Sequence, residues 1–317
     1  MGYYIAVDIG GTQMRAACIP CEKISPLIAK RISTQGLNVT PEERLVELIT
    51  TIWPEDQPVA AIGVAVAGWL DAYTGVIIEA PNIPGWGKLP LRQHLEDIFH
   101  VPVALGNDAN LAALGEWRFG AGINHHHLIY ITVSTGIGGG VIMDDRMVLG
   151  VRGMAAELGH VTILPDGPMC SCGQRGHLEA LASGPSIARW AQEELTKGKP
   201  SILPVGSPLT AKDVAIAAGQ GDELAKAALA RSGSYLGLAL ANYLHIFNPS
   251  IVIIGGGVSK SGPLLFEPMK AALHQYVMSP EYLDNLTLTT AALGDDVCLM
   301  GALALACALV PQHASIT

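Results

Sequence analysis

The stretch IAVDIGGTQMRAAC (residues 5–18) decides the fold, because its pattern returns as IYITVSTGIGGGVIM (residues 129–143). Each copy reads as an apolar strand, a glycine turn and a second strand that returns as a hairpin. We interpret the two copies as an internal duplication. A third apolar strand enters a glycine turn at PSIVIIGGGVS (residues 249–259). Strand signals alternate with helical signals along the chain, which is typical of an α/β protein.

The three glycine turns indicate a phosphate ligand. Glycine lets backbone N–H donors approach a phosphate without the clash of a Cβ atom. One such turn would be weak evidence, since hairpins use glycine for geometry alone. Three turns, two of them in duplicated hairpins, predict a nucleotide held between two similar domains. No segment reads G-x-x-x-x-G-K-[ST], and STGIGGG (residues 134–140) lies between two strands, so neither a P-loop nor a Rossmann fingerprint fits.

Local signals place the other elements. A helix is predicted at residues 41–53, with Thr40 as its N-cap and Pro41 at its first position. Further helices are predicted at 89–100, at 109–120, over most of 184–247, from about 264, and at 295–310. Buried strands are predicted at 59–70 and 101–108. The last helix is apolar, and we assign it to the core.

The composition limits the class of protein. The chain has 317 residues, enough for two domains and a sizeable core. No apolar run reaches the roughly 18 residues that a membrane span needs, and the N-terminus lacks the basic region of a secretory signal. Six cysteines are too few for a disulfide scaffold, and a net charge of −9 argues against a nucleic-acid surface. These features predict a cytoplasmic enzyme for a small molecule, with no nucleic-acid or membrane partner.

The segment ELGHVTILPDGPMCSCGQRGHLE (residues 157–179) carries a set of metal ligands. His160, Cys170, Cys172 and His177 supply four borderline-soft ligands, which suits tetrahedral zinc. Glycines let the loop fold back so that all four can point inward. The glutamates at the two ends of the segment would then be held against a polar substrate. The alternative is a flexible surface loop with ordinary thiols.

Two aspartates stand where a strand meets a turn or a helix. Asp8 ends the first strand, where it can hold Mg²⁺ near a transferring phosphoryl group, or merely cap its own turn. Asp108 follows Asn107 at a strand end just before a helix, which is typical of an N-cap. The helix N-terminus would also keep Asp108 ionised and fixed in place, as a general base requires.

Five ordered motifs resemble those of the ROK family (repressors, open reading frames and sugar kinases). They are DIGGT at 8–12, NDAN at 107–110, STGIGGG at 134–140, ELGH at 157–160 and CSCGQRGHLE at 170–179. The resemblance runs from residue 5 to about residue 310, essentially the whole chain. It implies an α/β protein with the two-domain actin-like/hexokinase (ribonuclease H-like) fold, with a sugar and ATP in the interdomain cleft.

This fold implies a domain division and a site. We expect a small domain of residues 1–120, joined by a C-terminal helix at about 296–317, and a large domain of residues 121–295 with the zinc loop. The resemblance implies that Asp108 is the general base for the sugar 6-hydroxyl. The implied sugar-binding residues are Asn107, Asp108, Glu157, His160 and Glu179, with Asn82 in PNIPGW (residues 81–86) as a weaker contact. The implied nucleotide and Mg²⁺ residues are Asp8, Gly10, Gly11, Thr12, Thr135, Gly136, Gly138, Gly139, Gly256 and Gly257.

The chain departs from the family pattern at the metal site. His160, Cys170 and Cys172 fall on the family's zinc positions, and His160 would give one ring nitrogen to the metal and one to the sugar. His177 stands where the fourth zinc ligand is usually cysteine. Histidine is an ordinary zinc ligand, so we expect structural zinc to be kept with somewhat altered affinity.

The resemblance implies ATP-dependent phosphorylation of a hexose by a homodimer or homotetramer. Glucose is the predicted sugar because the whole ring-binding set is present. Kinases for N-acetylmannosamine, fructose, allose or a glucoside stay open, since substrates that differ by one hydroxyl are distinguished by loop geometry. A sugar-sensing repressor is less expected, because DIGGT begins at residue 8 and leaves no room for a preceding helix-turn-helix region. A silent zinc-stabilised binding protein is less expected, because Asp8, Asp108 and the three glycine turns are all present.

Overall fold

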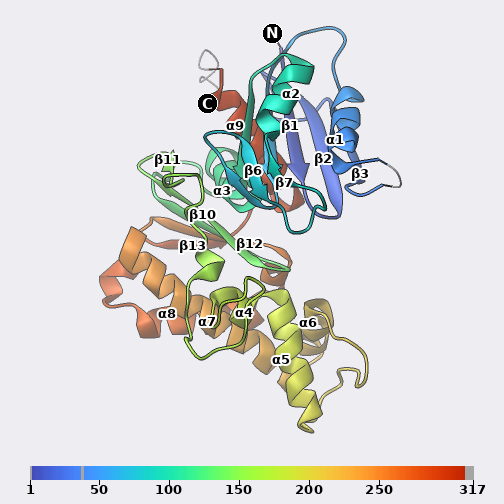
Figure 1. Cartoon of the computed structure of the whole chain (residues 1–317). Coiled ribbons are helices and arrows are strands. Elements are labelled where there is room, and N and C mark those ends of the chain that lie inside the picture. Colours follow the sequence, from blue (N-terminus) through green and yellow to red (C-terminus); the bar gives the residue numbers. More distant parts are fainter. Residues whose placement is uncertain (1, 37–38, 311–317) are drawn as a thin grey trace. The chain divides into compact units, whose positions relative to one another are not determined.

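The computed structural model describes residues 2–36 and 39–310, and within them the chain forms two compact units (Figure 1). Unit 1 is drawn from Met1–Asn124, Gly140–Ala156 and Ala292–Thr317, and unit 2 from His125–Gly139 and Glu157–Ala291. Unit 1 therefore takes in residues 140–156, which the sequence predicts in the large domain. Residues 311–317 of the predicted C-terminal helix lie outside the described residues.

Unit 1 contains a five-stranded sheet that begins with the first predicted hairpin. Its strands are β1 (Tyr3–Ile9), β2 (Gln13–Pro20), β3 (Ile28–Ser33), β4 (Val59–Val66) and β8 (Val103–Asn107), in the order β3-β2-β1-β4-β8. β1 and β2 pair antiparallel, whereas β1, β4 and β8 run parallel. The parallel strands are almost wholly buried, as expected where helices cover both faces of a sheet.

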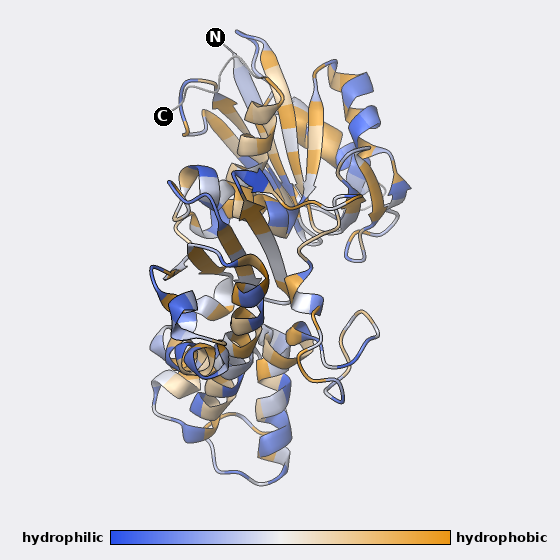
Figure 2. Cartoon of the chain, turned by 90° about the vertical axis from the view of Figure 1, so that its left-hand side faces the viewer, coloured by the Kyte–Doolittle hydropathy of each residue, from blue (hydrophilic) through white to orange (hydrophobic). Residues whose placement is uncertain are grey.

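Two hydrophobic cores flank this sheet, because successive side chains of a strand point to opposite faces. In β1, Ile5 and Val7 join the core under α1 (Pro41–Thr50) and α2 (Leu91–Phe99). Tyr4 and Ala6 join the opposite core, which packs against α3 (Asp108–Phe119) and α9 (Val297–Ala308). Figure 2 shows the strands of this sheet coloured mainly as hydrophobic. Asp8 continues the second face of β1, and its cross-strand partner there is Arg15 of β2.

Helix α9 packs very close to the sheet and to α3, because glycines line both contacts. A Cβ atom on Gly63 of β4 would lie 1.9 Å from the carbonyl oxygen of Ala302. A Cβ atom on Gly301 would lie 1.8 Å from the carbonyl oxygen of Leu111 in α3. Only glycine fits at such distances. The predicted assignment of this apolar helix to the core is confirmed, and its first turn is held beside the ends of β1 and β8.

Two predicted boundaries in unit 1 are wrong. The strand predicted at 59–70 ends at Val66, and β5 (Trp69–Asp71) joins a separate three-stranded sheet with β6 (Val76–Glu79) and β7 (Gly87–Leu89). Gly68 makes this break, because a Cβ atom there would lie 2.7 Å from the carbonyl oxygen of Glu79. The N-cap of α3 is Asn107, so Asp108 is the first helical residue instead of the cap.

The second five-stranded sheet contains the second predicted hairpin and the strand before the third glycine turn. It has the order β11-β10-β9-β12-β13, from β9 (Leu128–Val133), β10 (Ile137–Met143), β11 (Arg146–Met147), β12 (Ile251–Gly255) and β13 (Thr287–Thr290). Strand β11 and residues 140–143 of β10 belong to unit 1, and the other residues of this sheet belong to unit 2. β12 pairs parallel with both β9 and β13. The predicted internal duplication thus corresponds to two similar strand–turn–strand units, β1–β2 at the first glycine turn and β9–β10 at the second.

The helical part of unit 2 follows the prediction for residues 184–247. The helices are α4 (Leu178–Ala182), α5 (Gly184–Thr196), α6 (Ala211–Gly219), α7 (Glu223–Phe247) and α8 (Pro263–Tyr276). Helices α7 and α8 lie side by side (Figure 1), with Gly233 and Gly237 of α7 against the α8 backbone. Short 3-10 turns are η1 (Leu158–His160), η2 (Gly257–Ser261), η3 (Pro280–Leu283) and η4 (Gly294–Asp296). Among the described helices, none is both long and apolar enough to cross a membrane.

Candidate active site

In unit 1, the candidate residues gather at the carboxyl ends of the parallel strands. The strand register places Ile9 of β1 beside Val66 of β4, and Val66 beside Asn107 of β8. Asp8 and Asp108 are therefore at the same edge of one sheet. This is the edge at which open α/β sheets bind their ligands.

Asn107 and Asp108 are fixed by the start of α3. The Asn107 side-chain oxygen accepts from the N–H groups of Ala109 at 2.9 Å and Asn110 at 3.2 Å, and its amide donates to Gly68 O at 3.2 Å. Asp108 Oδ1 accepts from Ala109 N–H at 2.8 Å. A carboxylate in the first turn is favoured by the positive end of the helix dipole. The arrangement presents an ordered, half-buried carboxylate at the strand edge.

Asp8 is paired with a residue that sequence reasoning did not single out. Asp8 and Arg15 are direct cross-strand partners in the β1–β2 hairpin. The Arg15 guanidinium donates to Asp8 Oδ2 from Nη2 at 2.7 Å and from Nε at 3.1 Å, and to Asp296 Oδ1 from Nη1 at 3.0 Å. A carboxylate offers about four lone-pair sites, so the pairing orients Asp8 and still leaves it able to hold a hydrated Mg²⁺.

Asp8 and Asp108 both lie near Cys298 at the start of α9. Cys298 Sγ donates to the carbonyl oxygen of Asp108 at 3.6 Å. Burial, together with the negative charges of Asp8 and Asp108, raises the pKa of the Cys298 thiol well above its ordinary value. The first glycine turn is also close, because a Cβ atom on Gly11 would lie 2.5 Å from the Cβ of Asn82. Unit 1 thus brings Asp8, Asp108 and Cys298 together, and it places Asn82 against the Gly10–Thr12 turn.

In unit 2, the turn between β9 and β10 packs against the ELGH segment and against Glu179 at the start of α4. Glu179 Oε2 accepts from the N–H of Ile137 at 3.0 Å, and a Cβ atom on Gly136 would lie only 2.5 Å from the same oxygen. A Cβ atom on Gly159 would lie 1.8 Å from the carbonyl oxygen of Ile137. The Tyr243 hydroxyl donates to the carbonyl oxygen of Leu158, which anchors η1 to α7.

Three polar candidates of unit 2 interact with one another. Desolvation raises the pKa of the Glu157 carboxyl, the neighbouring His160 lowers it, and the negative charge of Glu179 raises it again. His160 and Glu179 both contact Cys170, whose Sγ lies 3.7 Å from His160 Nδ1 and 3.5 Å from Glu179 Oε1. Unit 2 therefore brings together two carboxylates and an imidazole, a group suited to hydrogen-bond a polyhydroxylated ligand.

The four predicted metal ligands converge. One ligand atom from each of His160, Cys170, Cys172 and His177 lies within 4.8 Å of the others. The two Nδ1 atoms of the histidines are 3.3 Å apart, Cys170 Sγ is 3.7 Å from His160 Nδ1, and Cys172 Sγ is 3.3 Å from His177 Nδ1. Tetrahedral zinc with bonds of about 2.0–2.3 Å separates its ligand atoms by roughly 3.3–3.8 Å. The donor set and its spacing therefore fit a zinc ion.

A glycine and two backbone hydrogen bonds fold the loop so that the four side chains can meet. Gly176 has a φ of +70°, and a Cβ atom there would lie 1.6 Å from the carbonyl oxygen of Leu164, so only glycine fits. Its N–H donates to Pro168 O at 2.9 Å, and its carbonyl accepts from Ile163 N–H at 2.8 Å. Burial, together with His160, lowers the pKa of His177, although Glu179 opposes this. A neutral imidazole is the form that binds a metal.

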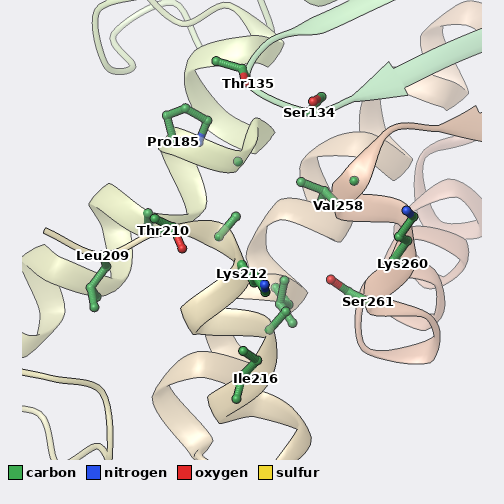
Figure 3. Close-up of a pocket in the computed structure, with 16 residues that line it drawn as sticks. Ser134, Thr135, Pro185, Leu209, Thr210, Lys212, Ile216, Val258, Lys260 and Ser261 are labelled. Carbon is green, nitrogen blue, oxygen red and sulfur yellow. The ribbon is translucent and has the colours of Figure 1, made fainter. Parts of the chain in front are cut away.

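A pocket of about 810 Å³ borders the same β9–β10 turn (Figure 3). Ser134 and Thr135 of the turn line it, as do Gly257 and Val258 of the third glycine turn. The remaining walls come from helices α5, α6 and α7 and from the 3-10 turn η2. The lining residues include Lys212 of α6 and Lys260 of η2. Both the volume and the largely apolar walls with a few polar groups are typical of cofactor sites.

Sequence reasoning found the glycine turns of this pocket but missed its walls. Figure 3 shows Pro185, Thr210, Lys212 and Val258 around the same space as Thr135. The available signal was the capping box of Thr210 and Asp213, which marks the start of α6. Gly256, at φ +83°, cannot carry a Cβ because the carbonyl oxygen of Val133 would lie 2.3 Å away. Gly256 therefore serves the backbone fold, and Gly257 faces the pocket.

Comparisons with known proteins agree with this geometry. The sequence pattern of the ROK family matches residues 4–308. The chain is 37% identical over 303 residues to a glucokinase of Thermotoga maritima, covering 94% of this chain and 95% of that protein. It is 31% identical to the xylose repressor of Bacillus subtilis, covering 95% of this chain and 76% of the repressor.

A solved structure shares the fold over nearly its whole length. It is a ROK family glucokinase from Streptomyces griseus in complex with glucose and AMPPNP, with a TM-score of 0.81 and 34% identity, covering 97% of this chain and all of that one. The predicted fold class, a mixed α/β fold of the two-domain actin-like kind, is thereby confirmed. The chain belongs to the ROK family.

Proposed function

We propose that this protein transfers the γ-phosphoryl group of ATP to the 6-hydroxyl of glucose. The observation that carries the proposal is the β9–β10 turn. Gly136 and Ile137 of this turn contact the carboxylate of Glu179, and Ser134 and Thr135 of the same turn line the 810 Å³ pocket. A phosphate bound at this turn lies between a polar sugar-type site and a nucleotide-sized pocket. The similarity to glucokinases, one of them solved with glucose and an ATP analogue, supports the same assignment.

The proposed roles of the individual residues come from the family resemblance, and the settings of several of them support it. The sugar is held by Asn107, Glu157, His160 and Glu179, with Asn82 as a further contact. Asp108 accepts the proton of the attacking hydroxyl, because its carboxylate is ordered at the start of α3. Phosphoryl transfer leaves the protein mainly positioning and electrostatics to supply. The turns at Gly10–Thr12, Thr135–Gly139 and Gly256–Gly257 supply backbone N–H donors and close approach to the phosphates.

Two metal ions are part of the proposal. Asp8, oriented by Arg15, would hold Mg²⁺ through water, and that ion would supply charge neutralisation to the phosphates. His160, Cys170, Cys172 and His177 would hold structural zinc, which stiffens the loop that carries Glu179. Because His160 and His177 both place Nδ1 in the cluster, the other ring nitrogen of His160 is left for the sugar.

Two further predictions complete the proposal: a cytoplasmic location, from the composition, and a homodimeric or homotetrameric state, from the family. The similarity to the xylose repressor favours one second candidate, a sugar-sensing regulator built on the same fold. A kinase for another hexose, a glucoside or N-acetylmannosamine differs only in which sugar the loops accept. These alternatives and glucokinase give different results in one experiment.

The test is a coupled ADP-release assay with glucose, fructose, allose, N-acetylmannosamine and methyl glucoside. We expect kcat/KM to be highest for glucose by at least about tenfold, since a site that hydrogen-bonds each hydroxyl rejects analogues that leave a buried partner unpaired. A different preferred sugar would correct the substrate and keep the reaction. Sugar binding without ADP release for any member of the panel would favour the regulator.

If the nucleotide binds in the unit 2 pocket, a bulky side chain at the pocket wall should weaken ATP binding. Replacing Gly257 with phenylalanine is expected to raise the KM for ATP at least about tenfold and to leave the KM for glucose within about twofold. A Cβ at Gly257 meets no atom within 4 Å, so the ring enters the pocket space without disturbing the fold. Initial rates at varied ATP and varied glucose measure the two constants.

Gly219→Phe is the matched control for this variant. Gly219 is exposed at the end of α6, a Cβ atom there would also meet nothing within 4 Å, and the residue does not line the pocket. Wild-type KM values are expected for it. An unchanged KM for ATP in Gly257→Phe would move the nucleotide away from this pocket.

A further inference from the structure

The carboxylate of Glu179 is held from two sides by different segments of unit 2. Glu179 is the second residue of α4. Its Oε2 accepts from the Ile137 N–H at 3.0 Å, at the β9–β10 turn. Its Oε1 accepts from the Ser171 hydroxyl at 2.9 Å and from the Cys170 thiol at 3.5 Å. One side chain therefore joins the metal-ligand loop to the turn that borders the nucleotide pocket.

The Glu179 carboxylate lies so close to the β9–β10 turn that a side chain at position 136 would collide with it. A Cβ atom on Gly136 would lie 2.5 Å from Glu179 Oε2, so the glycine makes room for the carboxylate. The carboxylate packs against the turn backbone at this point, and its Oε2 position fixes the Ile137 N–H. A rotation of the Glu179 side chain would break this bond and open space beside the turn.

The contact with the loop is made mainly by the Ser171 hydroxyl. This hydroxyl lies 2.9 Å from Glu179 Oε1, whereas the Cys170 thiol, a weaker donor, lies 3.5 Å from the same oxygen. The Ser171 hydroxyl is therefore the donor that keeps Oε1 directed at the loop. Hydrogen bonds to a charged group are among the stronger ones in proteins.

We infer that Ser171 is a positioning residue for Glu179, and that through Glu179 it ties the metal-ligand loop to the β9–β10 turn. The inference deepens the proposed function and rests on it where sugar binding is concerned. Ser171 sets the direction of the Glu179 carboxylate, so it controls the affinity for the sugar while the metal stays bound. About two of the four lone-pair sites of the carboxylate remain for sugar hydroxyls.

The experiment compares wild-type protein with Ser171→Ala and Ser171→Thr. Glucose affinity is measured by isothermal titration calorimetry, and amide hydrogen exchange at Ile137 is measured by mass spectrometry of the fragment that contains it. In Ser171→Ala we expect the Kd for glucose to rise about tenfold and exchange at Ile137 to accelerate, with zinc content unchanged. Ser171→Thr keeps the hydroxyl and is expected to restore both values.

Ser234→Ala is the matched control. Ser234 is an exposed serine of α7 whose hydroxyl donates to the carbonyl oxygen of Ala230 within its own helix. It is expected to leave glucose affinity and Ile137 exchange unchanged. Wild-type values for both quantities in Ser171→Ala would overturn the inference, and so would weaker glucose binding with no change at Ile137.

Failure of the proposed function gives a different pattern. If wild-type protein neither binds nor phosphorylates glucose, the proposed substrate is wrong. Faster exchange at Ile137 in Ser171→Ala would then still support the link between loop and turn, since that measurement needs no substrate. Unchanged exchange in that situation would overturn the link as well.

Discussion

Replacing Asp108 with asparagine is expected to lower kcat by about 10²–10⁴-fold, the range that a positioned general base typically supplies. Asparagine has nearly the same shape and keeps an oxygen for the Ala109 N–H, which Asp108 Oδ1 bonds at 2.8 Å. The start of α3 is therefore preserved, because its cap is the neighbouring Asn107. What the variant loses is the carboxylate that we propose as the acceptor of the proton of the sugar hydroxyl.

Three measurements separate this loss from a folding defect. The coupled ADP-release assay gives kcat, calorimetry gives the Kd for glucose, and thermal unfolding gives stability. We expect the Kd for glucose to change by less than about fivefold, since a neutral amide still hydrogen-bonds a hydroxyl. Asp284→Asn, at an exposed aspartate of unit 2, controls for the charge change. An undiminished kcat in Asp108→Asn would remove Asp108 from the role of base.

The order of strands and helices could be predicted because it depends on local sequence patterns. The alternation of Tyr4 and Ala6 with Ile5 and Val7 places the two faces of β1 without any knowledge of the partners. The glycine turns mark strand ends for the same local reason. The hydrophobic pattern predicted the wrong end for β4, because the apolar run continues past Val66, where the strand ends. The true end depends on the close approach of Gly68 to the backbone of Glu79, which the pattern does not report.

The candidate site was predictable where one short segment supplies several groups. The predicted metal ligands from His160 to His177 converge because the glycine-rich loop between them reverses direction. The choice of Asn107 over Asp108 as N-cap was not predictable, since both residue types cap helices and only the backbone angles decide. Arg15 was not singled out because its pairing with Asp8 depends on the exact register of the β1–β2 hairpin, and its other partner, Asp296, is distant in sequence.

The walls of the 810 Å³ pocket of unit 2 were also not predictable from the sequence. Lys212 and Lys260 approach one space from α6 and from the turn after β12, although 48 positions separate them in the chain. Hydrophobic periodicity reports which face of a helix is buried, and it carries no information about which distant segment lies opposite. The Ser171–Glu179 bond is hidden for a further reason, because it depends on side-chain rotamers as well as on the backbone.

Replacing His177 with alanine is expected to reduce zinc in the purified protein from about one ion per chain to well below that, and to raise the KM for glucose. Loss of an outer-shell partner alone costs about 10–100-fold in metal affinity. His177 is proposed as a direct ligand, and its Nδ1 lies 3.3 Å from both His160 Nδ1 and Cys172 Sγ. The His177 side chain makes no capping bond to α4, so its removal leaves the helix start intact. Plasma mass spectrometry after gel filtration measures the zinc.

His177→Cys distinguishes loss of a ligand from loss of a buried side chain. Cysteine supplies a thiolate in place of the imidazole, so we expect this variant to keep zinc and to hold it with an extra negative charge in the cluster. Chelation should lower the thermal unfolding temperature of wild type and of His177→Cys, but have little effect on a metal-free His177→Ala. Full zinc occupancy in the alanine variant would contradict the four-ligand site. Wild-type protein that binds no zinc would show that the loop is held by its hydrogen bonds alone, with Gly176 and its partners Pro168 and Ile163 as the fixed points.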